Sequence, residues 1–225
     1  MARAFLAVFL VGLASRIGFA NTYTVINTAD SGVSSLRQAI MDANSNPGAD
    51  TIAFNIPGAG VHIIALLSAL PAFTETVTID GYTQPTASAN TLPNGDNANL
   101  LIELNGTNAG SVVNGLTVSA NNCTIRGLVI NRFSRDGIQI DAGFTGNLIE
   151  GNFIGTDVNG GAAAANLNSG VLVLGNSNTI GGTTPAARNL ISGNGDASMG
   201  FNGIRLEFAN NNLAEGNIIA WTAAV

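Results

Sequence analysis

The sequence predicts an all-β protein whose short strands stack into a β-solenoid. Three observations predict it: charge is scarce, Gly and Asn are frequent, and the chain repeats itself. Of 225 residues, 46% are hydrophobic, 10% are charged and 28 are Gly, whereas about a quarter of the residues in a soluble domain are usually charged. Scarce charge together with few strong helix formers favours β structure.

The repeat is marked by equally spaced glycines in DGIQI, SGVLV and NGIRL, and an Asn-apolar segment follows each. Units this short cannot close a core alone, so they must stack on their neighbours. We expect Asn at the bends to hydrogen-bond in ladders along the stack, and Gly where a side chain would clash or φ is positive. The residues expected in these structural ladders are Asn147, Asn152, Asn178, Asn189, Asn194, Asn212, Gly137, Gly170 and Gly203.

The N-terminal residues predict export. Residues 1–20, MARAFLAVFLVGLASRIGFA, carry an early Arg and an apolar run too short to span a bilayer, followed by small residues. These are the features of a cleaved signal peptide. We therefore expect a signal peptide over 1–20 and one β domain over 21–225.

A short helix is predicted near the start of the β domain. Ser35 and Gln38 have the spacing of a capping box, and the apolar residues from Leu36 to Ala43 share one helical face. We expect this helix to cover the open first end of the stack, within a capping segment of about residues 21–58. At the other end the sequence stops in mid-repeat, at GNIIAWTAAV. Further repeats or a partner chain are therefore expected at the C-terminal end.

Charge and cysteine content restrict the partners. The formal net charge is −6, and all eight cations are Arg. A surface of this sign repels phosphate backbones, so nucleic acid is not an expected partner. No apolar stretch after residue 20 is long enough for a membrane span. The single Cys123 cannot form an internal disulfide, and its alternating surroundings predict a small buried residue.

Two groups of motifs resemble a known family. ADSGVSSLRQAIMDANSNPGADTIAFNIPG, residues 29–58, is similar to the N-terminal signature of bacterial secreted proteins with a Cys-Ser-Leu-Arg-Glu-Ala motif. GNFIGTDVNG and IGGTTPAARNLISGN resemble the repeats of that group, although Ser34 and Gln38 replace the signature Cys and Glu. The resemblance implies a right-handed parallel β-helix of the pectin-lyase-like type, secreted, extracellular or on the bacterial cell surface. It implies no particular activity.

Because this fold also carries polysaccharide lyases, hydrolases and uronate epimerases, we searched for catalytic residues. A lyase needs a base near the uronate carboxylate and a cation that neutralises it. The densest polar stretch, NRFSRDGIQID, holds the candidates Arg132, Arg135, Asp136 and Asp141. The alternative interpretation is a solvated loop, because Arg-Asp pairs at surface bends are common and contribute little.

Candidates for ligand and metal binding lie in two loops. Tyr82 precedes the long polar loop 83–99 and could stack on a sugar, and Asn97 within that loop could bind the same ligand. Loops of this length often carry function. Asp157 and Asn159 in TDVNGG offer oxygen ligands, so calcium is the one candidate cofactor. A plain Asx turn is the alternative for that stretch.

Two functions remain after this survey. The leading hypothesis is a secreted or cell-surface structural or adhesive module with weak binding of a polysaccharide or cell-surface glycan on its lateral face. It rests on the export signal, the regular Asn-Gly repeats and the lack of a convincing catalytic set. The alternative is a polysaccharide lyase or uronate epimerase that acts on an acidic glycan.

Overall fold

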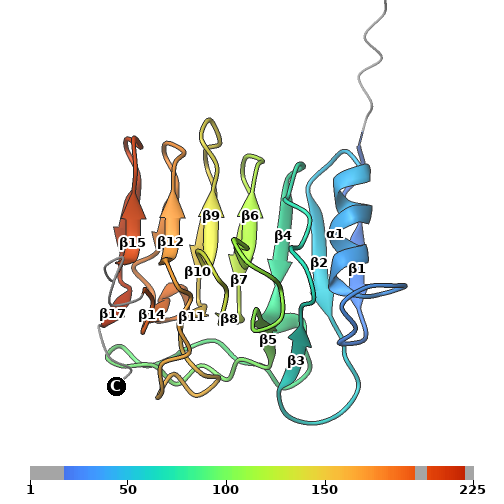
Figure 1. The fold of residues 1–225 in the computed structure, drawn as a ribbon, viewed down its shortest axis with the longest axis horizontal. Helices are drawn as coiled ribbons and strands as arrows, with labels where there is room; N and C mark the ends of the chain where they lie inside the picture. Colours follow the sequence, from blue (N-terminus) through green and yellow to red (C-terminus); the bar gives the residue numbers. More distant parts are fainter. Residues whose placement is uncertain (1–17, 196–201, 221–225) are drawn as a thin grey trace, which may run out of the picture.

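The computed structural model describes residues 18–195 and 202–220, and its strands form three parallel sheets (Figure 1). The seven-stranded sheet contains, in spatial order, β1 Thr22–Val25, β2 Asp50–Phe54, β4 Val77–Asp80, β7 Thr124–Arg126, β10 Leu148–Glu150, β13 Thr179–Gly181 and β16 Leu213–Glu215. The six-stranded sheet contains β17 Ile218–Ala220, β14 Leu190–Ser192, β11 Phe153–Ile154, β8 Leu128–Asn131, β5 Ile102–Asn105 and β3 His62–Ala65. The four-stranded sheet contains β15 Asn202–Leu206, β12 Ser169–Val173, β9 Ile138–Ile140 and β6 Leu116–Val118.

From β7 onwards the chain visits the three sheets in a fixed order. Each strand of the seven-stranded sheet is followed by one in the six-stranded sheet, and from β8 to β15 each of these is followed by one in the four-stranded sheet. Strands three apart in number, such as β7 and β10, are therefore hydrogen-bonded neighbours. We call one strand from each sheet, taken in chain order, a repeat.

The alternation of apolar and polar residues places the core between the sheets. In the seven-stranded sheet, Ile52, Ile79, Ile125, Ile149 and Ile180 lie in register and are at most 1% exposed. They belong to one buried cluster to which all three sheets contribute. Side chains of a strand point to opposite faces in turn, so the residues beside these isoleucines face outwards.

Helix α1, Leu36–Ser45, packs on β1 and β2 at the N-terminal end. The hydroxyl of Ser35 accepts a hydrogen bond from the N–H of Gln38 at 3.2 Å, which satisfies a free donor of the first turn. Its buried face consists of Leu36, Ala39, Ile40 and Ala43, all within the main core cluster. Two 3-10 helices follow later, η1 Gly81–Thr83 and η2 Pro185–Ala187.

This arrangement corrects the fold class predicted from the sequence. The expectation was an all-β, right-handed parallel β-helix with a short capping helix, but the structure has three separate parallel sheets combined with short helices, an α/β-like fold. The spacing of Gly and Asn predicts where short strands begin and end. It does not specify how strands are divided among sheets. The short helix predicted from its apolar face is confirmed as α1, which contributes four residues to the core.

A second, smaller cluster lies on the outer side of the six-stranded sheet. It consists of Leu100, Val129, Phe153 and Leu190, with Tyr82, Ala98, Val158 and Ile218 packed against them. The loop of residues 83–99 runs along this side towards the C-terminal end (Figure 1). There the guanidinium of Arg188 donates to the carbonyls of Leu92, Pro93 and Gly95 at 2.7–3.0 Å.

The export signal predicted over 1–20 lies almost wholly outside the described residues, which begin at residue 18. Among the described helices, none has the length and apolar character needed to cross a membrane.

Candidate functional site

Of the four residues predicted as a catalytic group, Arg132, Arg135 and Asp136 lie in the bend between β8 and β9, and Asp141 follows β9. Within the described chain, no hydrogen bond or ion pair joins any two of Arg132, Arg135, Asp136 and Asp141. Arg132 contacts Glu103 instead, with its Nη1 3.2 Å from Oε1.

The two carboxylates of this group serve the local structure. Asp136 is fully buried, and its Oδ1 accepts from the N–H of Ser169 and from Nδ2 of Asn168, each at 2.9 Å. Asp141 accepts from the hydroxyl of Ser119 at 2.5 Å and from Nε2 of Gln139 at 2.6 Å. Oδ2 of Asp136 is buried without a partner among the described residues. Asp136 is therefore enclosed by the protein, and Asp141 already accepts two hydrogen bonds within its own surroundings.

The predicted ligand-binding residues are also engaged within the protein. The hydroxyl of Tyr82 donates to the carbonyl of Gly151 at 2.7 Å, and burial, followed by the charges of Asp96, Glu150 and Asp80, raises the pKa of Tyr82. The ring packs in the second cluster.

Asn97 shapes its own loop. Its Oδ1 accepts from the N–H of Thr91 at 2.8 Å, and its backbone N–H donates to Oδ1 of Asn90 at 3.1 Å. The loop that was predicted as a contact surface is therefore closed by internal hydrogen bonds at this point.

The predicted calcium ligands form a turn. Oδ1 of Asp157 accepts from the N–H groups of Gly161 and Ala162 at 2.9 and 3.1 Å, and Asn159 is exposed. No group of three or more His, Cys, Asp or Glu side chains suited to a metal occurs among the described residues. The N–H of Gly160 also donates to the carbonyl of Asp157 at 3.1 Å, so the stretch is a backbone turn that the Asp157 carboxylate closes from further along the chain, and the expected Asx turn, with a bond to the N–H two residues on, is not formed.

The Asn residues predicted in ladders do contact one another from repeat to repeat. The N–H of Asn147 donates to Oδ1 of Asn178, and the N–H of Asn178 donates to Oδ1 of Asn212, at 2.9 and 2.8 Å. A second line joins Asn152 to Asn189 at 3.0 Å, and on to Asn217 through Nδ2 of Asn189 at 2.8 Å. Asn194 accepts from Nδ2 of Asn166 at 2.9 Å.

The predicted glycines lie at the start of β9, β12 and β15. A Cβ on Gly137 would come within 2.7 Å of the carbonyl of Gly170, and a Cβ on Gly170 within 2.7 Å of that of Gly203. Gly115 stands in the same line, because a Cβ there would meet the carbonyl of Gly137 at 2.4 Å. The sequence survey missed Gly115, which lies outside the regular spacing of the other three.

A regular line of hydroxyls lies on the outer face of the seven-stranded sheet. Thr22, Thr51, Thr78 and Thr124 are paired in register across β1, β2, β4 and β7, and Thr179 in β13 continues the line beyond Leu148. All five are exposed or partly exposed. Strands in a sheet are about 4.8 Å apart, so the hydroxyls of the first four threonines repeat at that interval, and Thr179 follows after the one strand that carries Leu148. We call these five residues the threonine row.

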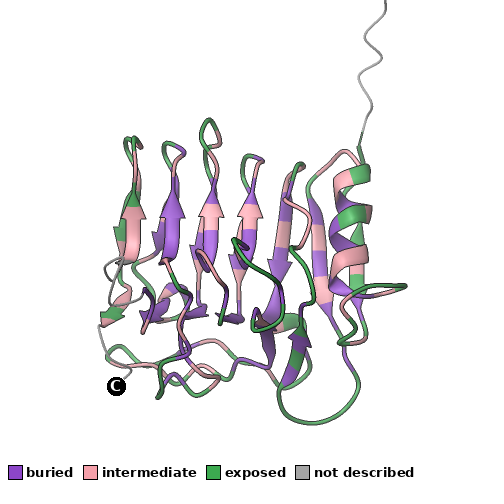
Figure 2. Ribbon diagram, in the orientation of Figure 1, coloured by how far each residue is buried: buried purple, intermediate pink, exposed green. Residues whose placement is uncertain are grey.

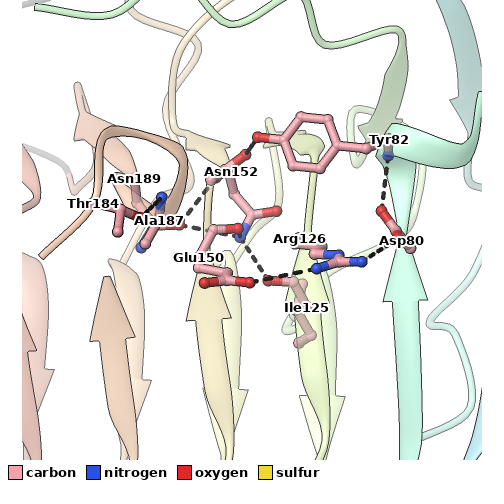
Figure 3. A network of polar contacts seen from close by, with 10 residues as sticks. Asp80, Tyr82, Ile125, Arg126, Glu150, Asn152, Thr184, Ala187 and Asn189 are labelled. Atoms are coloured by element: carbon pink, nitrogen blue, oxygen red, sulfur yellow. Dashed lines mark hydrogen bonds and ion pairs between the residues drawn. The ribbon is translucent and has the colours of Figure 1, made fainter. Parts of the chain in front are cut away.

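A charged row of Asp80, Arg126 and Glu150 runs beside it, two residues further along β4, β7 and β10 (Figure 3). Nη2 of Arg126 lies 2.7 Å from Oδ2 of Asp80, and its Nη1 lies 3.7 Å from Oε1 of Glu150. The hydrogen bond that Arg126 donates to Asp80 raises the pKa of Arg126 above its usual value, against the effect of burial. Glu215 in β16 lies in the same direction, beyond Gly181 of the intervening strand β13, and with it the row carries more negative than positive charge.

The two rows form the candidate site. Threonine offers a donor, an acceptor and a methyl group, so the threonine row can contact both the hydroxyls and the C–H groups of a linear polymer. The acidic excess of the charged row works against a polyanion. A signal in the sequence could have identified the site, because Thr-Ile occurs at 51–52, 78–79, 124–125 and 179–180.

Comparison of the sequence with protein-family models found no match, and comparison with curated proteins found none either.

Proposed function

We propose that the protein is a secreted or cell-surface module of structural or adhesive type that binds a neutral polysaccharide along the outer face of its seven-stranded sheet. The observation that carries the proposal is the threonine row, which places four hydroxyls on consecutive strands and a fifth beyond Leu148, all on one face. A repeating surface is suited to a repeating ligand, because each added strand and each added sugar contribute further contacts of the same kind. Many weak contacts then add up to useful affinity.

The charges beside the row support a neutral ligand over an acidic one. Arg126 is the only cation in the charged row, and it is already paired with Asp80 and Glu150. A uronate carboxylate bound there would have to displace one of these partners. The remaining carboxylates would repel it.

The alternative function, a polysaccharide lyase or uronate epimerase, has less support. Two of its candidate residues are engaged elsewhere, since Arg132 is paired with Glu103 and the buried Asp136 accepts from Asn168 and Ser169. Export to the cell surface is part of the proposal and rests on the sequence of residues 1–20 and on the resemblance of residues 29–58.

Co-sedimentation with insoluble neutral polysaccharides tests the proposal. Replacement of Thr78 and Thr124 by Val keeps the shape and removes two hydroxyls from the middle of the row, so we expect the affinity to fall by at least about tenfold. Thr107→Val, on an exposed turn away from the sheet, is the matched control and should bind as the unchanged protein does. The protein is also incubated with acidic polysaccharides, and the soluble products are analysed by mass spectrometry for unsaturated uronates. Equal binding by both variants, or release of unsaturated uronates, would contradict the proposal.

A further inference from the structure

Asp50 is a buried carboxylate without a cation beside it. It is the first residue of β2, a strand that alternates between buried and half-buried residues (Figure 2), and it is 1% exposed. Nδ2 of Asn46 donates to both of its oxygens, at 2.9 and 3.2 Å. Among the described residues, no arginine forms an ion pair with Asp50. Moving a charged carboxylate out of water costs free energy unless an opposite charge lies close to it.

The other donor to this carboxylate is the backbone nitrogen of Asn21. This nitrogen lies 2.8 Å from Oδ1 of Asp50. The carbonyl of the same residue accepts from the N–H of Thr51 at 2.8 Å. Asn21 comes directly before β1, which pairs with β2. The pairing of the two strands therefore fixes the nitrogen of residue 21 against the buried carboxylate.

Asn21 is also the first residue after the expected signal peptide. Gly18 and Ala20 supply small residues at the third and first positions before the cut, as an export peptidase requires. Hydrolysis of the Ala20–Asn21 bond consumes one water molecule, whose hydroxyl completes the carboxyl group of Ala20 and whose proton goes to the nitrogen of Asn21. At neutral pH the new carboxyl group gives up its proton and the new amine takes one up. The cut thus creates an α-ammonium group on Asn21.

We propose that Asp50 is the binding site of the new N-terminus: after residues 1–20 are removed, the α-ammonium of Asn21 pairs with the Asp50 carboxylate and stabilises the mature fold. The inference rests on export, which is part of the proposed function. Before the cut, the nitrogen of Asn21 is a neutral amide with a single proton. Hydrogen bonds between charged groups are about twice as strong as those between neutral ones.

The cut also changes the contacts of Asn46. Before it, Nδ2 of Asn46 donates to the carbonyl of Phe19 at 2.9 Å as well as to Asp50. Phe19 leaves with the signal peptide, so this donor is then free to serve the carboxylate alone. Arg3 and Arg16 leave as well, which makes the new amine the one positive charge that the cut adds next to Asp50.

The composition of the chain allows a selective test. The sequence contains no Lys, so the α-amine is the one amine in the mature protein. The full chain is produced in a bacterium that exports it, and mass spectrometry of the recovered protein should find Asn21 as the first residue. Acetylation of this protein while it is unfolded, followed by refolding, then removes the positive charge and keeps one N–H, as in the uncut chain.

Urea denaturation before and after acetylation measures the ion pair. We expect acetylation to lower the ratio of folded to unfolded protein by at least about tenfold, because it leaves a buried carboxylate without its cation. In the variant Asp50→Asn, acetylation should change the ratio by less than about twofold. The matched control is Asp30→Asn, which removes a carboxylate that is paired with Arg37. In this control the tenfold effect of acetylation should remain.

Three results would overturn the inference: a recovered chain that begins at another residue, a stability that acetylation leaves unchanged, or an effect of acetylation as large in Asp50→Asn as in the unchanged protein. The first two need no substitution, so they decide the matter even if Asp50→Asn does not fold. Failure of the proposed function looks different. A protein that begins at Asn21 and shows the Asp50-dependent effect, but binds no polysaccharide, would contradict the proposed ligand and leave the ion pair in place.

Discussion

Asn147 and Asn178, 31 residues apart in the chain, are joined by two hydrogen bonds to a single oxygen. The backbone N–H and the side-chain Nδ2 of Asn147 donate to Oδ1 of Asn178 at 2.9 and 3.0 Å. Both residues are at least 98% buried. The contact links consecutive repeats at the bend that precedes a strand of the seven-stranded sheet.

Asn178→Ala is expected to destabilise the protein strongly. It leaves the buried N–H of Asn147 without an acceptor and the carbonyls of Phe144 and Asn176 without the Nδ2 donor. Each unsatisfied buried group costs about 1–3 kcal/mol, so the free energy of unfolding should fall by at least about 2 kcal/mol. Urea denaturation measures this. The control Asn159→Ala changes an exposed residue and should have little effect; equal losses would contradict the role of the buried contact.

Gly170→Ala tests the close approach at the start of β12. The added methyl would lie 2.5 Å from Cγ2 of Ile191 and 2.7 Å from the carbonyl of Gly203, so both neighbours must move. We expect a loss of about 1–3 kcal/mol, as for other overpacked sites. The matched control is Gly161→Ala, where a Cβ meets nothing within 4 Å. Thermal unfolding measures the stability of both variants. A Gly170→Ala protein as stable as the unchanged protein would show that the close approach at residue 170 does not require glycine.

Arg188→Ala is expected to release the loop of residues 83–99. The guanidinium holds the carbonyls of Leu92, Pro93 and Gly95 on one side and that of Gly216, at 3.1 Å, on the other. Without it, limited proteolysis should cut near Gly95 at a rate well above that of the unchanged protein. Lys keeps the charge but lacks the planar set of donors, so Arg188→Lys should be cut at an intermediate rate. Unchanged cleavage of the Ala variant would mean that the second cluster alone holds the loop.

Asp30 should make stability depend on pH in the acid range. Burial acts to raise the pKa of Asp30, but hydrogen bonds from the N–H of Leu67 at 2.9 Å and from Arg37 at 2.8 Å outweigh it, and the pKa lies below its ordinary value. The charged form is therefore favoured in the folded state. Its stabilisation is present above the unfolded pKa of about 3.9 and is lost as the pH falls through the lower folded value.

The melting temperature of Asp30→Asn, followed from neutral to acid pH, checks this. The variant should be less stable than the unchanged protein at neutral pH. The difference should shrink as the pH falls below about 4. A constant difference across the range would contradict the linkage.

Cys123 should report unfolding. It is 1% exposed, and burial raises the pKa of its thiol to about 11, against the effect of a backbone hydrogen bond from Val77. Because the thiolate is the reactive form, a disulfide reagent at pH 8 should modify the folded protein very slowly and the urea-unfolded protein fast. The rate measured across a urea series should follow the unfolding transition. Fast modification in the absence of urea would show that this part of the core opens readily.

Some features could be predicted from the sequence because they depend on local rules. The capping pair Ser35 and Gln38 is close in the chain, and so is the apolar face of α1. The glycines of β9, β12 and β15 are recognisable by their spacing. The threonine row was missed because its members, such as Thr78 and Thr124, are separated by segments of unequal length.

The sequence by itself determined the short strands, the bends between them and the helix at the first end, since strand length, turn residues and apolar spacing act over a few neighbouring positions. Only the tertiary structure decided how the strands are divided among three sheets and which side chains meet. It moved Asp136 into the interior, paired Arg132 with Glu103, and lined up five threonines on one face. The physical reason is that register and burial depend on contacts between residues far apart in the chain, such as Thr78 and Thr124, which neither composition nor spacing specifies.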